Sequence, residues 1–197
     1  MGAMAEPSAE ALGAGPRVGR PSMLAVGTVV WLASELMFFS GLFAGWFALR
    51  TATPVWPPEG AEVDPLRTGA ATVVLLASSF TMHAATRAAE HGDRRAAVRW
   101  VLATVAMGSV FVANQALEYT ELHFSVASHA YGSIFYLMTG FHGLHVIGGL
   151  ALMLAVIGVG TGRTRASLAE GLTVTEYYWH FVDVVWVGMF VTIYVLG

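Results

Sequence analysis

The sequence predicts an all-α integral membrane protein, built as a bundle of five transmembrane helices. Of its 197 residues, 56% are hydrophobic and only 12% are charged, whereas an average soluble domain is about 45–50% apolar and about 25% charged. The few charges divide the chain into long uncharged stretches, and the arginines gather at alternate ends of those stretches. This composition excludes a typical soluble enzyme, a disordered chain and a nucleic-acid binder built on a basic surface.

The charged residues set the limits of the predicted helices. A hydrocarbon core of ~30 Å needs ~20 apolar helical residues at ~1.5 Å each. The first uncharged stretch is interrupted only by Glu35 and the last only by Asp183. The residues between Glu121 and Tyr131 are polar, so we expect a loop there and a single helix after it. The predicted helices span residues 23–49, 67–87, 98–119, 131–159 and 175–196, within one domain over 23–197.

The placement of the arginines predicts the orientation. Eight of the ten lie in the N-terminal segment or in the loops after the second and fourth helices, and only Arg50 and Arg67 lie on the other side. The positive-inside rule then places the N-terminus in the cytoplasm and the C-terminus outside. Residues 1–22 are rich in Gly, Ala and Pro and have no apolar run, which predicts a disordered cytoplasmic tail rather than a cleaved signal peptide.

Ionisable side chains within a span are candidate functional groups, because each costs about 2.5–3.5 kcal/mol to insert at a helix centre. Glu35 lies near the middle of the first helix. His142 and His145 share a face of the fourth helix, and His180 and Asp183 share a face of the fifth. From spacing alone, Glu35 is either structural or proton-exchanging, and the histidines are most simply hydrogen-bonded residues that hold helices together.

Depth within the membrane also predicts a partner for Glu35. A histidine of the fourth helix lies at the same level, and His145 is preferred over His142 because it is nearer the helix centre. A second helix contact is suggested by Gly41 and Gly45, which form a GxxxG step in the first helix.

We expect no catalytic residue, metal or cofactor in this chain itself. There is no Cys to supply thiolate ligands, and of the three deep histidines two lie on one helix. Four arginines near the predicted cytoplasmic surface are expected to contact anionic lipid head groups; they are Arg87, Arg94, Arg95 and Arg99.

Several strings within these helices resemble a known family. They are SELMFF at residues 34–39, QALEY at 115–119, GFHGLHV at 140–146 and YWHFVDVVW at 178–186. From about residue 22 onward, the chain resembles subunit III of heme–copper cytochrome c oxidases in its short, five-helix bacterial form. Longer members have seven helices, and we expect this chain to lack counterparts of the first two, so their lipid-cleft sites are not carried over.

The resemblance implies a non-redox subunit of a proton-pumping terminal oxidase in the bacterial plasma membrane. Such a subunit stabilises the catalytic subunit I and supports proton uptake, while heme and copper reside in subunits I and II. Bound phospholipid is implied, as is contact with cytochrome c or a cytochrome bc complex through the holoenzyme, and nucleic acid is not. Alternatives are a subunit III of a quinol oxidase or a relative that accompanies nitric oxide reductases.

A different class also stays open, namely a small proton-coupled transporter that uses Glu35 and Asp183 as carriers. Transporters commonly show internal repeats and broken helices, and neither is visible in the sequence. The glutamate in the first string and the unbroken string of the fifth helix favour the cytochrome c branch of the oxidases.

Overall fold

The computed structural model describes residues 23–61, 63–159 and 165–196, and within these ranges every regular element is helical. The elements are α1 (Met23–Ala52), α2 (Pro65–Glu90), α3 (Arg94–Glu121), α4 (Ala130–Val159), α5 (Arg165–Phe190) and a short π-helix, η3 (Val191–Val195). Five helices are long and apolar enough to cross a membrane, which confirms the predicted fold class. The predicted tail 1–22, with Arg17 and Arg20, lies outside the described residues, as does Arg163.

The helices extend past their predicted boundaries, and the largest error is at α5. This helix begins at Arg165, whereas the prediction began at residue 175. The prediction used the uncharged stretch after Glu176 as the whole helix. A transmembrane helix can carry charged residues in the turns that leave the hydrocarbon core, and Glu176 has imidazole partners that stabilise it within the bundle.

Two aspartates set the starts of α2 and α3 a few residues earlier than predicted. The Asp64 carboxylate accepts hydrogen bonds from the backbone N–H groups of Leu66 and Arg67 at 3.0 and 3.1 Å. Asp93 accepts one from the backbone N–H of Ala96 at 2.9 Å. These N-caps satisfy backbone donors that have no partner within the helix.

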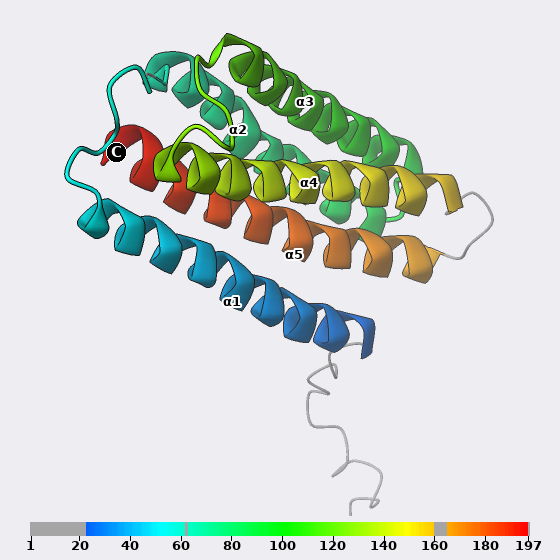
Figure 1. The fold of residues 1–197 in the computed structure, drawn as a ribbon. Helices are drawn as coiled ribbons and strands as arrows, with labels where there is room; N and C mark the ends of the chain where they lie inside the picture. Colours follow the sequence, from blue (N-terminus) through cyan, green and yellow to red (C-terminus); the bar gives the residue numbers. More distant parts are fainter. Residues whose placement is uncertain (1–22, 62, 160–164, 197) are drawn as a thin grey trace, which may run out of the picture.

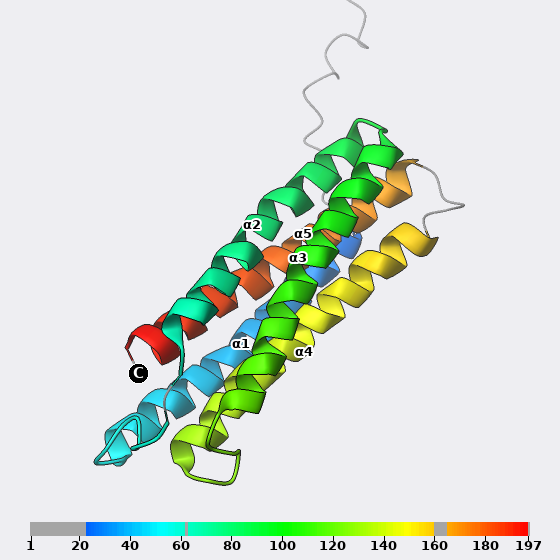
Figure 2. The same ribbon diagram turned by 90° about the horizontal axis from the view of Figure 1, so that it is seen from above.

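α5 is the central helix of the bundle (Figures 1 and 2). α5 packs against α1, α2 and α4, while α3 packs against α2 and α4, and α1 packs mainly against α4 and α5. One end of the bundle holds the start of α1 and the connection between α2 and α3, and we call it the Arg-rich end. The opposite end holds the last described residues of the chain and is called the C-terminal end (Figure 2).

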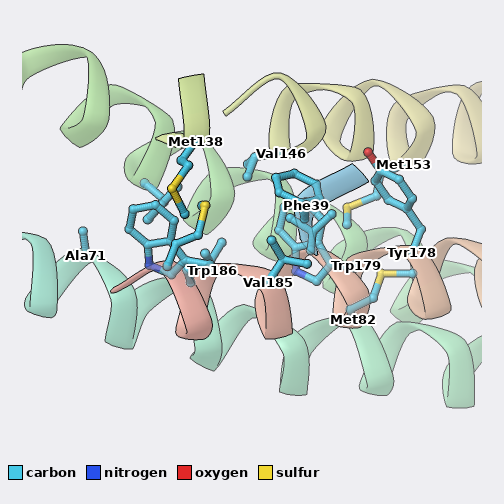
Figure 3. Packing of buried hydrophobic residues seen from close by; sticks show 14 of the residues in the cluster. Phe39, Ala71, Met82, Met138, Val146, Met153, Tyr178, Trp179, Val185 and Trp186 are labelled. Carbon is cyan, nitrogen blue, oxygen red and sulfur yellow. The ribbon is translucent and has the colours of Figure 1, made fainter. Parts of the chain in front are cut away.

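Two tryptophans of α5 fill the centre of the bundle, where Met138, Val146 and Met153 of α4 lie against them (Figure 3). Trp179 and Trp186 are fully buried, and their indole N–H groups donate to hydroxyls of α2. Trp179 Nε1 donates to Ser78 Oγ and Trp186 Nε1 to Thr72 Oγ1, each at 2.9 Å. These bonds let a large side chain with one polar atom be buried without an unpaired donor.

Close helix approach depends on glycines other than the predicted pair. A Cβ placed on Gly108 of α3 or Gly149 of α4 would lie 2.9 Å from the Trp179 ring. Among the described residues, a Cβ placed on Gly41 would meet no atom of another helix within 4 Å, and one on Gly45 would meet only a side-chain atom of Ile134 at 3.6 Å. The tight contact suggested at Gly41 and Gly45 is therefore not formed within the described part of this chain, where the closest approaches occur at glycines that face a bulky ring.

Candidate functional site

Glu35 and His145 join α1 to α4 at the middle of the membrane span. His145 Nε2 lies 3.1 Å from Glu35 Oε2, which confirms the predicted pairing. His145 Nδ1 lies 2.7 Å from the carbonyl oxygen of Phe141. Because a carbonyl only accepts, Nδ1 carries a hydrogen and donates it, so that this bond fixes the ring orientation.

This arrangement gives the number of protons held in the hydrogen bonds of the Glu35–His145 pair. Nδ1 already holds one proton, and the bond to Glu35 holds a second, either on the carboxyl or on Nε2. Without these two protons, each group would carry one negative charge, and with both protons the pair is neutral. The two groups thus share one transferable proton and need no further partner to balance their charge.

His142 differs from its neighbour on α4, since it is buried and neither ring nitrogen has a hydrogen-bond partner among the described residues. Its ring stacks on Trp186, with centroids 4.8 Å apart, and meets Phe111 edge-on at 6.0 Å. The expectation that His142 is hydrogen-bonded between helices is therefore wrong. The ring is held by aromatic packing, because the face it occupies is lined by the core of the bundle.

A second polar cluster, which we call the α2–α5 chain, consists of His83, Glu176, His180, Ser79 and Asp183. Glu176 Oε1 lies 2.7 Å from His83 Nδ1 and 3.4 Å from His180 Nε2. His180 Nδ1 lies 2.9 Å from Ser79 Oγ, and the Ser79 hydroxyl also donates to Asp183 Oδ2. His180 and Asp183, predicted to act together, are thus joined through a serine of the neighbouring helix.

The proton count of the α2–α5 chain differs from that of the Glu35–His145 pair. Glu176, His180, Ser79 and Asp183 are four groups joined by three hydrogen bonds, and each bond holds one proton. Without those protons, the four groups would carry four negative charges, so the three hydrogen-bonded protons alone leave the chain one proton short of neutrality. His83 adds one group and one hydrogen-bonded proton, so the shortage of one proton is unchanged.

A third cluster surrounds Glu118 near the C-terminal end, and its donors satisfy the Glu118 carboxylate. Gln115 donates to this buried carboxylate at 2.8 Å and Thr68 at 3.2 Å. The Tyr194 hydroxyl, on η3, lies 2.9 and 3.1 Å from its two oxygens. Arg67 forms an ion pair with Glu121 beside it. This cluster ties α2, α3 and the end of the chain together.

Three of the four arginines predicted to bind lipid head groups lie together at the start of α3. Arg94, Arg95 and Arg99 line one pocket of about 840 Å³, together with Asp93 and Val98. Arg87 is in the last turn of α2 and is not among the lining residues. The pocket is at the Arg-rich end of the bundle.

Three members of the α2–α5 chain, His83, Glu176 and Ser79, are not among the predicted site residues, and the sequence holds only a weak signal for them. Glu176 served only to mark the start of a span, although its separation of four residues from His180 places both on one helix face. Ser79 lies in an ordinary run of small residues, and only the packing of α2 on α5 identifies it. Within residues 23–61, 63–159 and 165–196, no group of three or more His, Asp or Glu side chains is arranged to hold a metal.

Comparison with known proteins gives consistent matches. The sequence profile of the family described as cytochrome c oxidase subunit III matches residues 17–197. A protein of Nocardia farcinica named "Probable cytochrome c oxidase subunit 3" is 49% identical over 182 residues, which cover 90% of each chain. A protein of Mycobacterium tuberculosis with the same name is 48% identical over the same shares of both chains. The "Cytochrome c oxidase subunit 3" of a Synechocystis strain is 39% identical, over 90% of this chain and 78% of that relative.

Proposed function

Because this chain belongs to the cytochrome c oxidase subunit III family, we propose that it acts within a terminal oxidase as a subunit without a redox centre. The family match over nearly the whole chain is the observation that carries this function. The oxidoreductase activity, from cytochrome c to oxygen with proton translocation, belongs to the complex. The names of the relatives favour this function over the quinol-oxidase and transporter alternatives.

The partners of the chain are the catalytic subunit I, with its hemes and copper, and the copper-bearing subunit II. The chain stabilises subunit I and supports its proton supply. Both mid-membrane clusters suit such a role, since the Glu35–His145 pair shares one transferable proton and the α2–α5 chain links five proton-exchanging groups. Cytochrome c or a cytochrome bc complex interacts with the holoenzyme as a whole.

Membrane placement follows from the five spans and the arginines. The protein is multi-pass, and we assign it to the bacterial plasma membrane with the Arg-rich end in the cytoplasm. The chain has no cysteine, so single-cysteine variants report topology directly. An impermeant maleimide added to whole cells should label Glu59→Cys, in the loop after α1, and should label His91→Cys only after lysis. The reverse pattern would contradict the assignment.

Bound anionic phospholipid is part of the proposal. Arg94, Arg95 and Arg99 offer three positive charges around one pocket, and each arginine near an anionic surface contributes about 1 kcal/mol. Replacing all three with Gln should lower the amount of anionic lipid that co-purifies with the oxidase, as measured by lipid mass spectrometry. Replacing Arg50 and Arg67, at the C-terminal end, is the matched control.

Purification of the tagged chain from its native membrane tests the function. Heme-bearing partners should co-elute, and the eluate should oxidise reduced cytochrome c while consuming oxygen. Removing the chain should leave oxygen reduction possible but make turnover slower or shorter-lived. Co-elution without any heme protein, or oxidation of a quinol but not of cytochrome c, would contradict the proposal.

A further inference from the structure

The α2–α5 chain is open to the outside of the bundle at the depth of the membrane. The side chains of His83 and His180 are 51% and 44% exposed, although both lie within transmembrane helices. Ionisable groups within a membrane almost always face a protein interior or a water-filled cavity. An exposed imidazole at this position is therefore a sign that another surface covers it.

A pocket of about 400 Å³ lies over the inner part of this chain. It is lined by residues of two helices, which are Leu76, Ser79, His180, Asp183, Val184 and Val187. Asp183 is only 3% exposed, and its Oδ1 has no hydrogen-bond partner among the described residues. A buried carboxylate oxygen without a donor is unusual, and it belongs to the group of side chains that is one proton short of neutrality.

Apolar side chains surround the pocket along both helices. Val73 and Phe80 of α2 and Val184, Val187 and Val191 of α5 are exposed, and they recur at intervals of three, four or seven residues. The result is a polar pocket within an apolar stripe that runs along the groove between the two helices. Transmembrane helices associate through such faces, where close packing is combined with a polar side chain that hydrogen-bonds across the interface.

We propose that the groove between α2 and α5 is the docking surface for a transmembrane helix of the heme-bearing subunit, and that this helix supplies a hydrogen-bond donor to Asp183. The inference rests on the proposed function, because it requires an oxidase partner. The donor is the side chain of a Ser, Thr, Asn, Gln, His or Arg at the depth of Asp183. It satisfies the carboxylate oxygen that has no hydrogen-bond partner among the described residues of this subunit.

Two other occupants fit less well. A lipid acyl chain matches the valines and Phe80 but offers no donor to Asp183. A second copy of this chain would bring a second cluster with the same shortage of a proton to the same depth. A partner helix with a donor satisfies both the apolar stripe and the carboxylate.

A photocrosslinking amino acid placed in the intact oxidase tests the docking surface. Val184 is 71% exposed and lies at the pocket, while Val110 is 55% exposed and lies on α3, away from it. Benzoylphenylalanine at Val184 should crosslink to a transmembrane peptide of the heme-bearing subunit, identified by mass spectrometry, and the same residue at Val110 should not. Crosslinks from Val184 to lipid only, or to a second copy of the chain, would overturn the proposal.

A steric variant provides an independent readout. Val184→Trp should block the groove and leave the fold of the subunit intact, because Val184 is an exposed side chain. Retention of the subunit on tagged heme-bearing partners during detergent washing should then fall at least fivefold. Val110→Trp should leave retention unchanged. Equal retention of both variants would overturn the docking surface while leaving the oxidase function intact. If the unmodified chain fails to co-purify with heme proteins, the proposed function itself has failed.

Discussion

The Glu35–His145 pair and the α2–α5 chain lie at similar depth but differ in their charge balance. The pair is closed, since His145 donates to a backbone carbonyl and shares one proton with Glu35. The α2–α5 chain has three hydrogen-bonded protons for four groups, and Asp183 Oδ1 has no donor among the described residues. The comparison teaches that a hydrogen-bonded cluster within a membrane can be satisfied internally or can depend on a partner, and counting protons distinguishes the two.

The largest effect is expected from removing the imidazole at the centre of the α2–α5 chain. His180→Ala removes the group that links the buried carboxylates of Glu176 and Asp183, and removing one partner of a buried carboxylate costs about 3 kcal/mol. The subunit should unfold at a lower temperature and should be lost from the oxidase during detergent incubation. His123→Ala, at an exposed position, is the control. Equal losses for both variants would show that the hydrogen bonds of the α2–α5 chain do not stabilise the subunit.

A smaller loss is expected when the closed pair is broken. Glu35→Ala removes the partner of His145 Nε2 and leaves a half-buried ring nitrogen unpaired, which costs about 1–3 kcal/mol. Thermal unfolding of the purified subunit measures this change. Because the pair balances its own charge, the loss should be the same in the isolated subunit and in the oxidase. A loss seen only in the complex would mean that Glu35 also contacts a partner.

Tyr194→Phe tests the third cluster and provides a reference of intermediate size. The variant removes one of three donors to the Glu118 carboxylate and keeps the ring, so we expect a loss of about 1 kcal/mol in unfolding free energy. Thr68 and Gln115 still donate to the carboxylate. A loss as large as that of His180→Ala would show that the π-helix contributes more than this single bond.

The smallest effect is expected from Glu35→Gln. Glutamine has the size of glutamate, and its amide N–H can donate to His145 Nε2, which retains the hydrogen bond but removes the transferable proton. Stability should change by less than about 0.5 kcal/mol. If the pair exchanges protons, oxygen-linked proton uptake by the oxidase should slow while the subunit stays bound. An unchanged uptake rate would restrict Glu35 to a structural role.

Composition and charge spacing predicted the five helices, because apolar length is the dominant requirement of the hydrocarbon core. Depth along each helix predicted the pairing of Glu35 with His145 for the same reason, since both residues had to lie at mid-membrane. Lateral neighbours were not predicted. Ser79 takes part only because α2 packs on α5, and His142 has no hydrogen-bond partner among the described residues because its ring faces Trp186. Helical periodicity gives the face of a residue, and the neighbour on that face depends on the packed bundle.

The structure of the intact oxidase tests the central claim most directly, namely that the α2–α5 chain depends on a partner. The deciding measurement is the distance from Asp183 Oδ1 to the nearest donor of another subunit. We expect a transmembrane helix of the heme-bearing subunit to lie over Val184 and Val187, with a donor within ~3.2 Å of that oxygen. A groove filled by lipid acyl chains, with Asp183 Oδ1 still lacking a donor from another subunit, would contradict the account.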